Sequence, residues 1–243
     1  MLSHLLVLSV LSLGCFIAHR ERTSIQSIPA APHFESVVAA DTQALLPRAQ
    51  EIELALKAAP VHLRDEATVY TFGKNGYEKV REGKNGFNCL VNRDGTQNGA
   101  QSVYPTCWDP EGSRTILPVM LRVGELIARK KSAAEIKRDI DDGFAQGRFQ
   151  SPSKTGIAYM LAGDVKFDQK TGQFGSIEFA PHYMIYAPGV TNADIGVSGE
   201  AMKKTPGLPF VYSGYSGGTR TAYLIVMANQ SPGHTMQSQN HLR

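Results

Sequence analysis

The stretch Gly83–Asp109, GKNGFNCLVNRDGTQNGAQSVYPTCWD, decides how this chain folds. It lies between a run of short strand patterns and the longest helical patterns, and it holds two of the three cysteines, Cys89 and Cys107. In an exported chain we expect these thiols to form one disulfide, because oxidising compartments lack the reductants that keep cytosolic cysteines free. Closing the loop between them should remove about 3 kcal/mol of chain entropy from the unfolded state.

The N-terminal sequence predicts export. Residues 5–18, LLVLSVLSLGCFIA, form an apolar run typical of the core of a secretory signal peptide. The run is shorter than the roughly 20 residues that a membrane-spanning helix needs. We therefore expect a signal peptide over residues 1–18, a flexible tether over 19–40, a single domain over 41–230 and a disordered tail over 231–243.

A lipid anchor is the alternative reading of the same segment. Ser12-Leu13-Gly14-Cys15 resembles a lipoprotein cleavage box, but leucine stands where a small residue is usual. Lipidation at Cys15 is the only membrane attachment that we expect. The predicted location is thus periplasmic or extracellular, with a lipoprotein anchored at Cys15 as the alternative.

The composition is that of an ordinary globular protein. The chain has 243 residues, of which 42% are hydrophobic and 19% charged. The net charge is +3, and the lysines and arginines are scattered along the chain, which does not favour nucleic-acid binding. The sequence contains no P-loop, dinucleotide fingerprint or paired zinc-ligand motif, so we predict no cofactor and no metal site.

Helical and strand patterns alternate in blocks along the chain. Three helices are predicted, over 41–59, over 115–131 with Ser113 as its cap, and after Ser132, where Ser132 and Glu135 match a capping box. Strand patterns separated by Asn-Gly pairs over 67–91 predict an antiparallel meander. Further strands are predicted over 156–161, 164–167, 176–179, 181–188, 210–212 and 222–227.

These blocks define the expected fold class. Strands, then helices, then strands are typical of an α+β fold. We predict an antiparallel sheet, made of the meander and the C-terminal strands, packed with about three helices and closed by one disulfide between Cys89 and Cys107.

Five blocks of the sequence carry a resemblance to a known group of proteins: Leu63–Val69, Arg81–Cys89, Pro105–Asp109, Gly156–Leu161 and Pro181–Met184. In these blocks the chain resembles a group of bacterial exported proteins that has no assigned activity. The resemblance spans most of the mature chain and implies export and a single fold, but it implies no mechanism. Related chains often carry a second histidine in the closing strand, where this chain has Thr221-Ala222-Tyr223, so a site built on two histidines is not expected.

Ser216 is the first candidate for chemistry. Gly214–Gly218, GYSGG, matches the G-x-S-x-G nucleophile elbow of serine hydrolases and follows an apolar strand pattern. The usual order of that motif requires an acidic residue and then a histidine downstream. No acidic residue follows Glu200, however, and the apolar run after Gly218 is more typical of a strand than of a helix. A glycine-rich turn is therefore the favoured interpretation.

His182 heads the second set of candidates. It could serve as a general acid or base, although a single histidine without nearby ligand partners more often has a structural role. Asp164 and Asp168 could offer oxygens to calcium, but a role in stabilising a hairpin turn is the favoured interpretation. If the protein has a pocket, we expect its ligand-binding residues to be His182, Tyr186, Asn192 and Asp194, because function concentrates in loops held by rigid strands.

Two classes of function follow from this reading. The favoured one is a binding module of the periplasm or cell envelope, whose partner is an unidentified small molecule or an envelope protein. The alternative is a hydrolytic enzyme that uses Ser216 as nucleophile or His182 as acid or base. A concave pocket joining His182 to Asp194 would favour a ligand site or catalysis.

Overall fold

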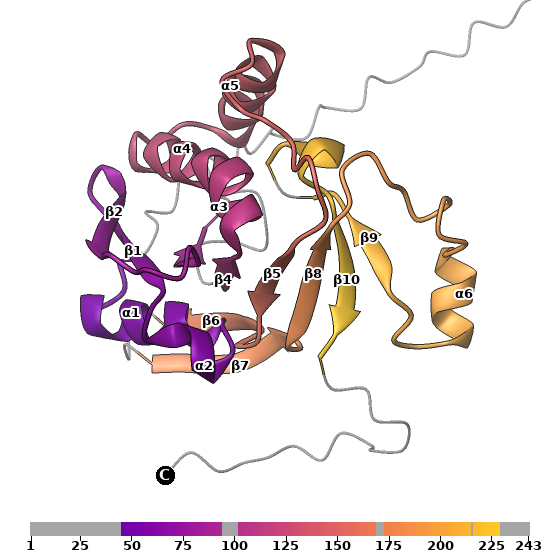
Figure 1. Ribbon diagram of the computed structural model, residues 1–243, viewed down its shortest axis with the longest axis horizontal. Coiled ribbons are helices and arrows are strands. Elements are labelled where there is room, and N and C mark those ends of the chain that lie inside the picture. The colour runs from indigo at the N-terminus through magenta and orange to yellow at the C-terminus, as the bar shows by residue number, and fades with distance from the viewer. Residues whose placement is uncertain (1–44, 94–101, 169–172, 215, 229–243) are drawn as a thin grey trace, which may run out of the picture. The chain divides into compact units, whose positions relative to one another are not determined.

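The centre of the fold is a strand that is buried along its whole length, β4 (Ser102–Trp108). The computed structural model describes residues 45–93, 102–168, 173–214 and 216–228 (Figure 1). Contacts divide the chain into two units, Met1–Val38 and Ala39–Arg243, and all described residues belong to the second. The predicted signal peptide, Cys15, the tether and the C-terminal tail lie outside the described residues.

The described strands form one mixed, mostly antiparallel sheet. Its order is β2-β1-β3-β4-β5-β8-β10-β9, and the hairpin β6–β7 branches from the first part of β4. The α+β class with about three longer helices and one disulfide is therefore confirmed. The other strands are β1 (Thr68–Gly73), β2 (Gly76–Arg81), β3 (Asn88–Asn92), β5 (Ile157–Met160), β6 (Asp164–Asp168), β7 (Gln173–Phe179), β8 (His182–Tyr186), β9 (Phe210–Tyr212) and β10 (Tyr223–Met227).

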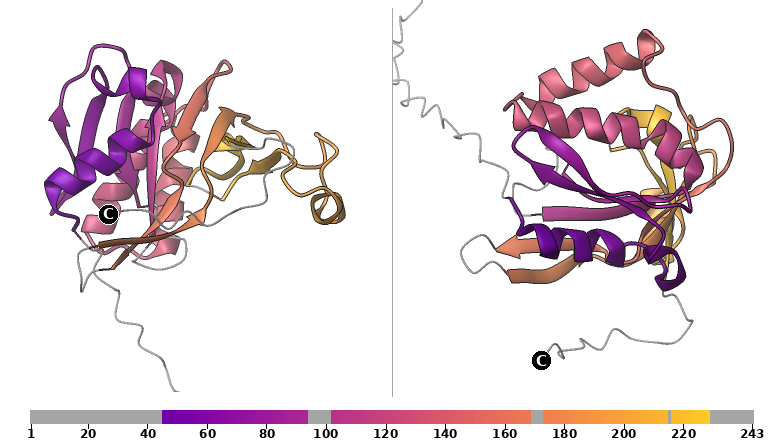
Figure 2. Two further views of the ribbon diagram at one scale, coloured as in Figure 1. Left: turned by 90° about the horizontal axis from the view of Figure 1, so that it is seen from below. Right: turned by 60° about the vertical axis from the view of Figure 1, so that its left-hand side comes forward.

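Helices cover both faces of this sheet. Figure 2 shows α4 and α5 on one side of the strands and α1, together with β6 and β7, on the other. The helices are α1 (Arg48–Lys57), α2 (Val61–Arg64), α3 (Pro110–Thr115), α4 (Leu117–Ala128), α5 (Ala133–Ala145), α6 (Gly199–Lys204) and the 3-10 helix η1 (Gly218–Thr221).

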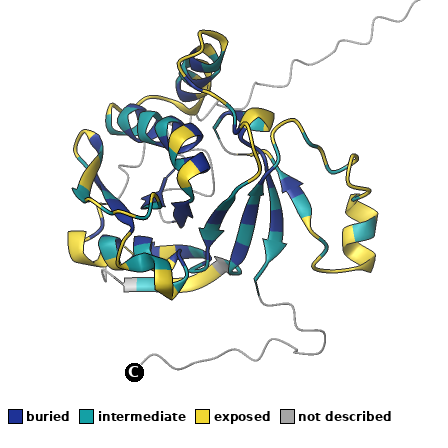
Figure 3. Ribbon diagram, viewed as in Figure 1, coloured by how far each residue is buried: buried dark blue, intermediate teal, exposed yellow. Residues whose placement is uncertain are grey.

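The alternation of side chains along β3 explains why there are two hydrophobic cores. Leu90 points to the core under α3, α4 and α5, whereas Cys89 and Val91 point to the core under α1. Successive side chains of a strand face opposite sides, so an entirely apolar run is needed where both faces are covered. Figure 3 shows buried residues concentrated in the strands, while α6 is largely exposed.

The disulfide joins two residues that face each other across the sheet. Cys89 and Cys107 are direct register partners in the antiparallel β3–β4 pair, and their Cα atoms are 4.0 Å apart. Both side chains are fully buried in the core beneath α1. The predicted disulfide is therefore confirmed, and it fastens the central strand pair from inside the core.

The predicted antiparallel meander was wrong at one strand pairing. β3 pairs in parallel with β1, while β2 stays at the end of the sheet. After β2 the chain crosses the start of β1, where the amides of Lys84 and Asn85 donate to the carbonyl of Glu66 over 2.8 and 3.2 Å. Gly83 permits this close passage, because a Cβ there would stand 2.2 Å from the Glu66 oxygen. The Asn-Gly pair at 85–86 therefore ends a crossover and does not form a hairpin turn.

Of the helix caps predicted from the sequence, one is confirmed and one is wrong. The capping box at Ser132 and Glu135 is present and starts α5, as predicted. Ser113 was predicted as a cap, which was wrong. The carboxylate of Asp109 instead accepts from the amide of Gly112 and starts α3, with Pro110 in the first turn, where its missing N–H costs nothing.

One buried ion pair attaches α1 to the sheet. Glu51 of α1 accepts from the amide of Phe72 and from Arg93 over 3.0 and 2.9 Å, and both charged side chains are about 1% exposed. The guanidinium of Arg93 also lies over the Phe72 ring. Breaking such a pair would leave a buried charge without compensation, so this contact holds α1 in one position.

We predict that loss of the disulfide destabilises the protein without changing its fold class. The Cys89→Ala/Cys107→Ala variant should lose about 3 kcal/mol of unfolding free energy, which lowers Tm by roughly 6–12 °C for a domain of this size. Thermal denaturation followed by circular dichroism measures the change. Wild-type protein reduced with dithiothreitol is the control, because it lacks the bond but keeps both sulfur atoms. An unchanged Tm after verified reduction would contradict the prediction.

Candidate functional site

His182 lies at the start of β8 and is buried. Its side chain is 2% exposed, its ring meets the Phe179 ring edge-on at 4.9 Å, and its Nδ1 lies 2.8 Å from the carbonyl oxygen of Ala180. Because a carbonyl only accepts, Nδ1 donates this bond. Burial lowers the pKa of His182, although the bond to Ala180 opposes that effect. The histidine therefore has the environment of a neutral structural residue.

Tyr186 ends the same strand and joins three elements. Its hydroxyl donates to Asp109 Oδ1 over 2.7 Å and also lies 2.9 Å from the carbonyl oxygen of Ile157. The other Asp109 oxygen accepts from the amide of Ile157, so the carboxylate connects the start of α3 with β5 and β8. Burial raises the pKa of Tyr186, and the nearby Tyr223 and Asp109 raise it further.

Asn192 closes an edge of the sheet. Its side-chain amide accepts from the Val211 amide over 2.6 Å and donates to the Val211 carbonyl over 2.9 Å. Val211 belongs to β9, the last strand of the sheet, so Asn192 occupies backbone groups that a further strand would otherwise pair with. The residue protects a strand edge.

Asp194 stabilises the turn next to Asn192. Its Oδ2 accepts from both the amide and the hydroxyl of Thr191, over 2.8 and 2.7 Å, and these bonds lower the pKa of the exposed Asp194. The four predicted ligand residues thus have separate partners. His182 and Tyr186 share one buried face of β8, whereas Asn192 and Asp194 bond within their own loop and to β9.

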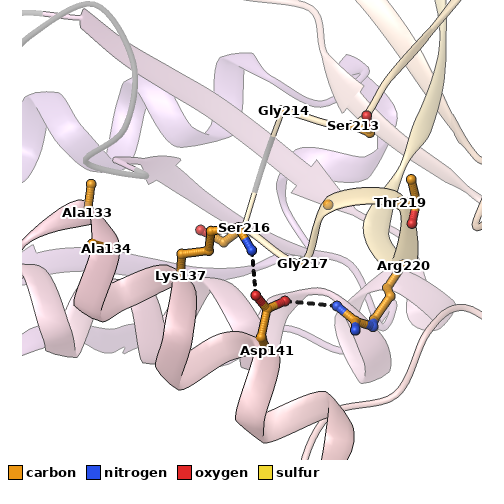
Figure 4. Close-up of a pocket in the computed structure, with 11 residues that line it drawn as sticks. Ala133, Ala134, Lys137, Asp141, Ser213, Gly214, Ser216, Gly217, Thr219 and Arg220 are labelled. Atoms are coloured by element: carbon orange, nitrogen blue, oxygen red, sulfur yellow. Dashed lines mark hydrogen bonds and ion pairs between the residues drawn. The ribbon is translucent and has the colours of Figure 1, made fainter.

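A pocket lies elsewhere, between α5 and the turn that precedes β10. Its cavity volume is about 640 Å³, and we call it the α5 pocket. One wall is formed by Ala133, Ala134, Lys137 and Asp141 of α5, three of which recur at every fourth position and so share a helix face. Ser213–Gly214 and Ser216–Arg220 form the other wall (Figure 4).

A three-membered charge network connects the two walls. Asp141 accepts from Lys137 Nζ over 2.5 Å and from Arg220 Nη1 over 2.9 Å, as the dashed lines in Figure 4 show. The hydrogen bond from Lys137 is the main reason that the pKa of Asp141 lies below its usual value; burial opposes it and Arg220 supports it. All three side chains reach solvent, with exposed fractions of 78% for Lys137, 46% for Arg220 and 37% for Asp141.

The turn wall is held by backbone contacts. Gly217 has φ +102°, and a Cβ there would come within 2.7 Å of Thr221, so glycine is required. The Thr221 hydroxyl donates to the carbonyl of Ser216, and the Arg220 guanidinium lies over the Phe144 ring of α5 at 5.2 Å. At Gly218, by contrast, a Cβ would meet no atom within 4 Å. Thr221 thus holds the turn at Ser216, while the space beside Gly218 is open.

Ser216 lines this pocket, but His182, the histidine proposed as acid or base, lies far from it. His182 pairs with Met227 at one end of the β8–β10 ladder, whereas Ser216 precedes the other end, where Tyr223 pairs with Tyr186. The ends are four residues apart, or roughly 13 Å at strand spacing. Lys137 is held in an ion pair, and an ion-paired ammonium has no lone pair with which to accept a proton. The serine is also followed by a 3-10 turn, not by the helix of a nucleophile elbow.

The sequence singled out Ser216 of the α5 pocket but missed its charged residues, Lys137, Asp141 and Arg220. The α5 helix was predicted, and the Lys137–Asp141 spacing on it was a visible signal for a charged helix face. Arg220 is 79 positions from Asp141, and nothing local in the sequence indicates that the two meet.

Asp164 and Asp168 lie at the two ends of β6 in the β6–β7 hairpin. Among the described residues, no cluster of three or more histidine, cysteine or acidic side chains is arranged to hold a metal ion. None of the helices in the described ranges combines the length and apolar character needed to cross a bilayer.

Comparisons of the chain with protein-family models, curated proteins and solved structures found no match. The resemblance of its sequence blocks to bacterial exported proteins therefore stays a prediction.

A substitution at Tyr186 tests whether this predicted ligand residue of β8 instead stabilises the fold. We predict that Tyr186→Phe lowers the unfolding free energy by about 1.5–3 kcal/mol, the usual contribution of a hydrogen bond to a charged group. Tyr183→Phe is the matched control, since Tyr183 lies on the half-exposed face of the same strand, and its loss should be near zero. Urea denaturation measures both. Equal stability of the two variants would contradict the role assigned to Tyr186.

Proposed function

We propose that the protein is an exported binding module that holds a small molecule with an anionic group in the α5 pocket. The observation that carries the proposal is the placement of Lys137 and Arg220 on opposite walls of one cavity, with a single carboxylate, Asp141, between them. These groups sum to one positive charge. A ligand carboxylate or phosphate would supply the missing negative charge.

The size and lining of the pocket support a small-molecule ligand. A volume of about 640 Å³ falls within the roughly 300–1,000 Å³ typical of ligand pockets. The hydroxyls of Ser213, Ser216 and Thr219 line the turn wall and can donate hydrogen bonds to an anion or accept them from the rest of a ligand. The Thr221 hydroxyl holds the carbonyl of Ser216, which limits the ordering that this residue needs on binding.

The disulfide supports the export part of the proposal. A buried disulfide in the centre of the sheet is expected of proteins that fold in an oxidising compartment and is rare in the cytosol. We infer that the mature protein is periplasmic or extracellular. An envelope protein as partner remains the alternative to a small molecule.

Binding is tested by isothermal titration calorimetry with succinate and inorganic phosphate as probes. Lys137→Gln or Arg220→Gln should weaken binding about tenfold or more, because each removes a charged hydrogen-bond donor. The matched control is Lys203→Gln on α6, an exposed lysine paired with Glu200 in the same way. Added salt should weaken binding, since the charges are partly exposed.

A second variant blocks the pocket without removing charge. Gly218 has φ +57°, a conformation that asparagine tolerates better than most residues, and its missing side chain leaves open space at the pocket wall. Gly218→Asn should therefore weaken binding, with a small fall in Tm because a side chain at this positive φ is strained. Failure of both probes to bind the wild-type protein, or unchanged binding by all three pocket variants, would refute the proposal.

The hydrolase alternative has a separate test. We expect no hydrolysis of p-nitrophenyl acetate that depends on Ser216. Turnover by the wild-type protein that Ser216→Ala removes, and that His182→Gln leaves intact, would establish an enzyme. Turnover lost in His182→Gln but kept in Ser216→Ala would instead assign the acid–base role to His182.

The N-terminus of the exported protein is tested by intact mass spectrometry. We expect a mature chain that lacks residues 1–18 and carries no added mass. A mass that includes a diacylglyceryl group on a new N-terminal Cys15 would replace free export by the lipoprotein alternative. Retention of residues 1–18 would contradict both.

A further inference from the structure

We infer that the ligand of the α5 pocket is a zwitterion that carries an α-amino acid group. The inference rests on the proposed function, because it concerns the same pocket. It follows from the arrangement of three charges in the pocket. The carboxylate of Asp141 lies between the cations of Lys137 and Arg220 and pairs with both.

The carboxylate of Asp141 would repel a ligand that carries only negative charge. Its carboxylate is 37% exposed, lines the pocket and stands within 2.5–2.9 Å of both cations. An anion that approaches either cation therefore also approaches Asp141, and the two negative charges repel each other. The same carboxylate attracts a ligand ammonium. A ligand that carries both charges can place its ammonium beside Asp141, so that this carboxylate attracts the ligand.

The spacing of the charges matches that of an α-amino acid. Asp141 and Arg220 present opposite charges 2.9 Å apart. In an α-amino acid the ammonium nitrogen and the carboxylate are bonded to one carbon, which places the two charges roughly 3 Å apart. The ligand carboxylate can thus lie on Arg220 and Lys137 while its ammonium lies on Asp141, and each charge meets its opposite.

The remainder of the pocket suits a polar substituent. Ser213, Ser216 and Thr219 stand on the wall opposite α5. A polar side chain of an amino acid would meet the hydroxyl groups of these residues.

The test compares glycine, N-acetylglycine and glycinamide by calorimetric or NMR titration. These probes carry both charges, only the carboxylate and only the ammonium, respectively, and none has a side chain that could clash. The wild-type protein should bind glycine at least about tenfold more tightly than either derivative, since each derivative loses one charged contact.

The Asp141→Asn variant gives the decisive readout, because the inference predicts opposite signs for two probes. Affinity for glycine should fall about tenfold, whereas affinity for N-acetylglycine should rise, since the repelling charge is gone. Asp194→Asn is the matched control, because it removes an exposed carboxylate from a turn outside the pocket and should change neither value. Gly218→Asn should weaken binding of all three probes, because it adds a side chain at the pocket wall.

The outcomes separate the two proposals. If N-acetylglycine or succinate binds in the pocket as tightly as glycine, or if Asp141→Asn changes both affinities in the same direction, the zwitterion inference is wrong and the anion-binding function stands. If neither glycine nor any anionic probe binds, both proposals fail. Binding of glycinamide alone would show that Asp141 dominates the pocket and would overturn both as well.

Discussion

The pairing of β3 with β4, joined by the Cys89–Cys107 bond, is the constraint on which the rest of the structure depends. β4 pairs with β3 on one side and with β5 and β6 on the other, and it is buried on both faces. A one-residue shift in its register would move every side chain to the opposite core. The disulfide excludes such a shift, because the two cysteines must lie directly opposite each other.

The end of β4 then places the helical layer. Trp108 donates to the Tyr223 hydroxyl over 2.9 Å inside the core, and the next residue, Asp109, starts α3 and receives the Tyr186 hydroxyl. β4, β8, β10 and α3 are thereby connected by side chains that also belong to the larger hydrophobic core. The helices α4 and α5 continue from this anchored start, so their position over the sheet follows from the same strand.

The α5 pocket forms where the last helix of that layer, α5, lies beside the turn that leads into β10. α5 is amphipathic, with Ile136 and Ile140 buried, and its charged side faces the turn that leads into β10. Gly217 and Gly218 of this turn carry no side chains that could fill the space, and Arg220 contacts Phe144 and Asp141 of the helix. A cavity with opposed charges results at the border between the helical layer and the sheet, where loops held by rigid elements commonly carry function.

The sequence by itself determined the features that depend on neighbouring residues. The α+β class, the start of α5 at Ser132 and the cysteines that pair all follow from periodicity, capping and composition, whose physical causes act within a few residues. The tertiary structure alone decided that β3 lies parallel to β1, that Asn192 closes the edge of β9, and that Arg220 meets an aspartate 79 positions away. Such contacts depend on how the whole chain packs. The residues around one partner therefore do not indicate which distant residue it will contact.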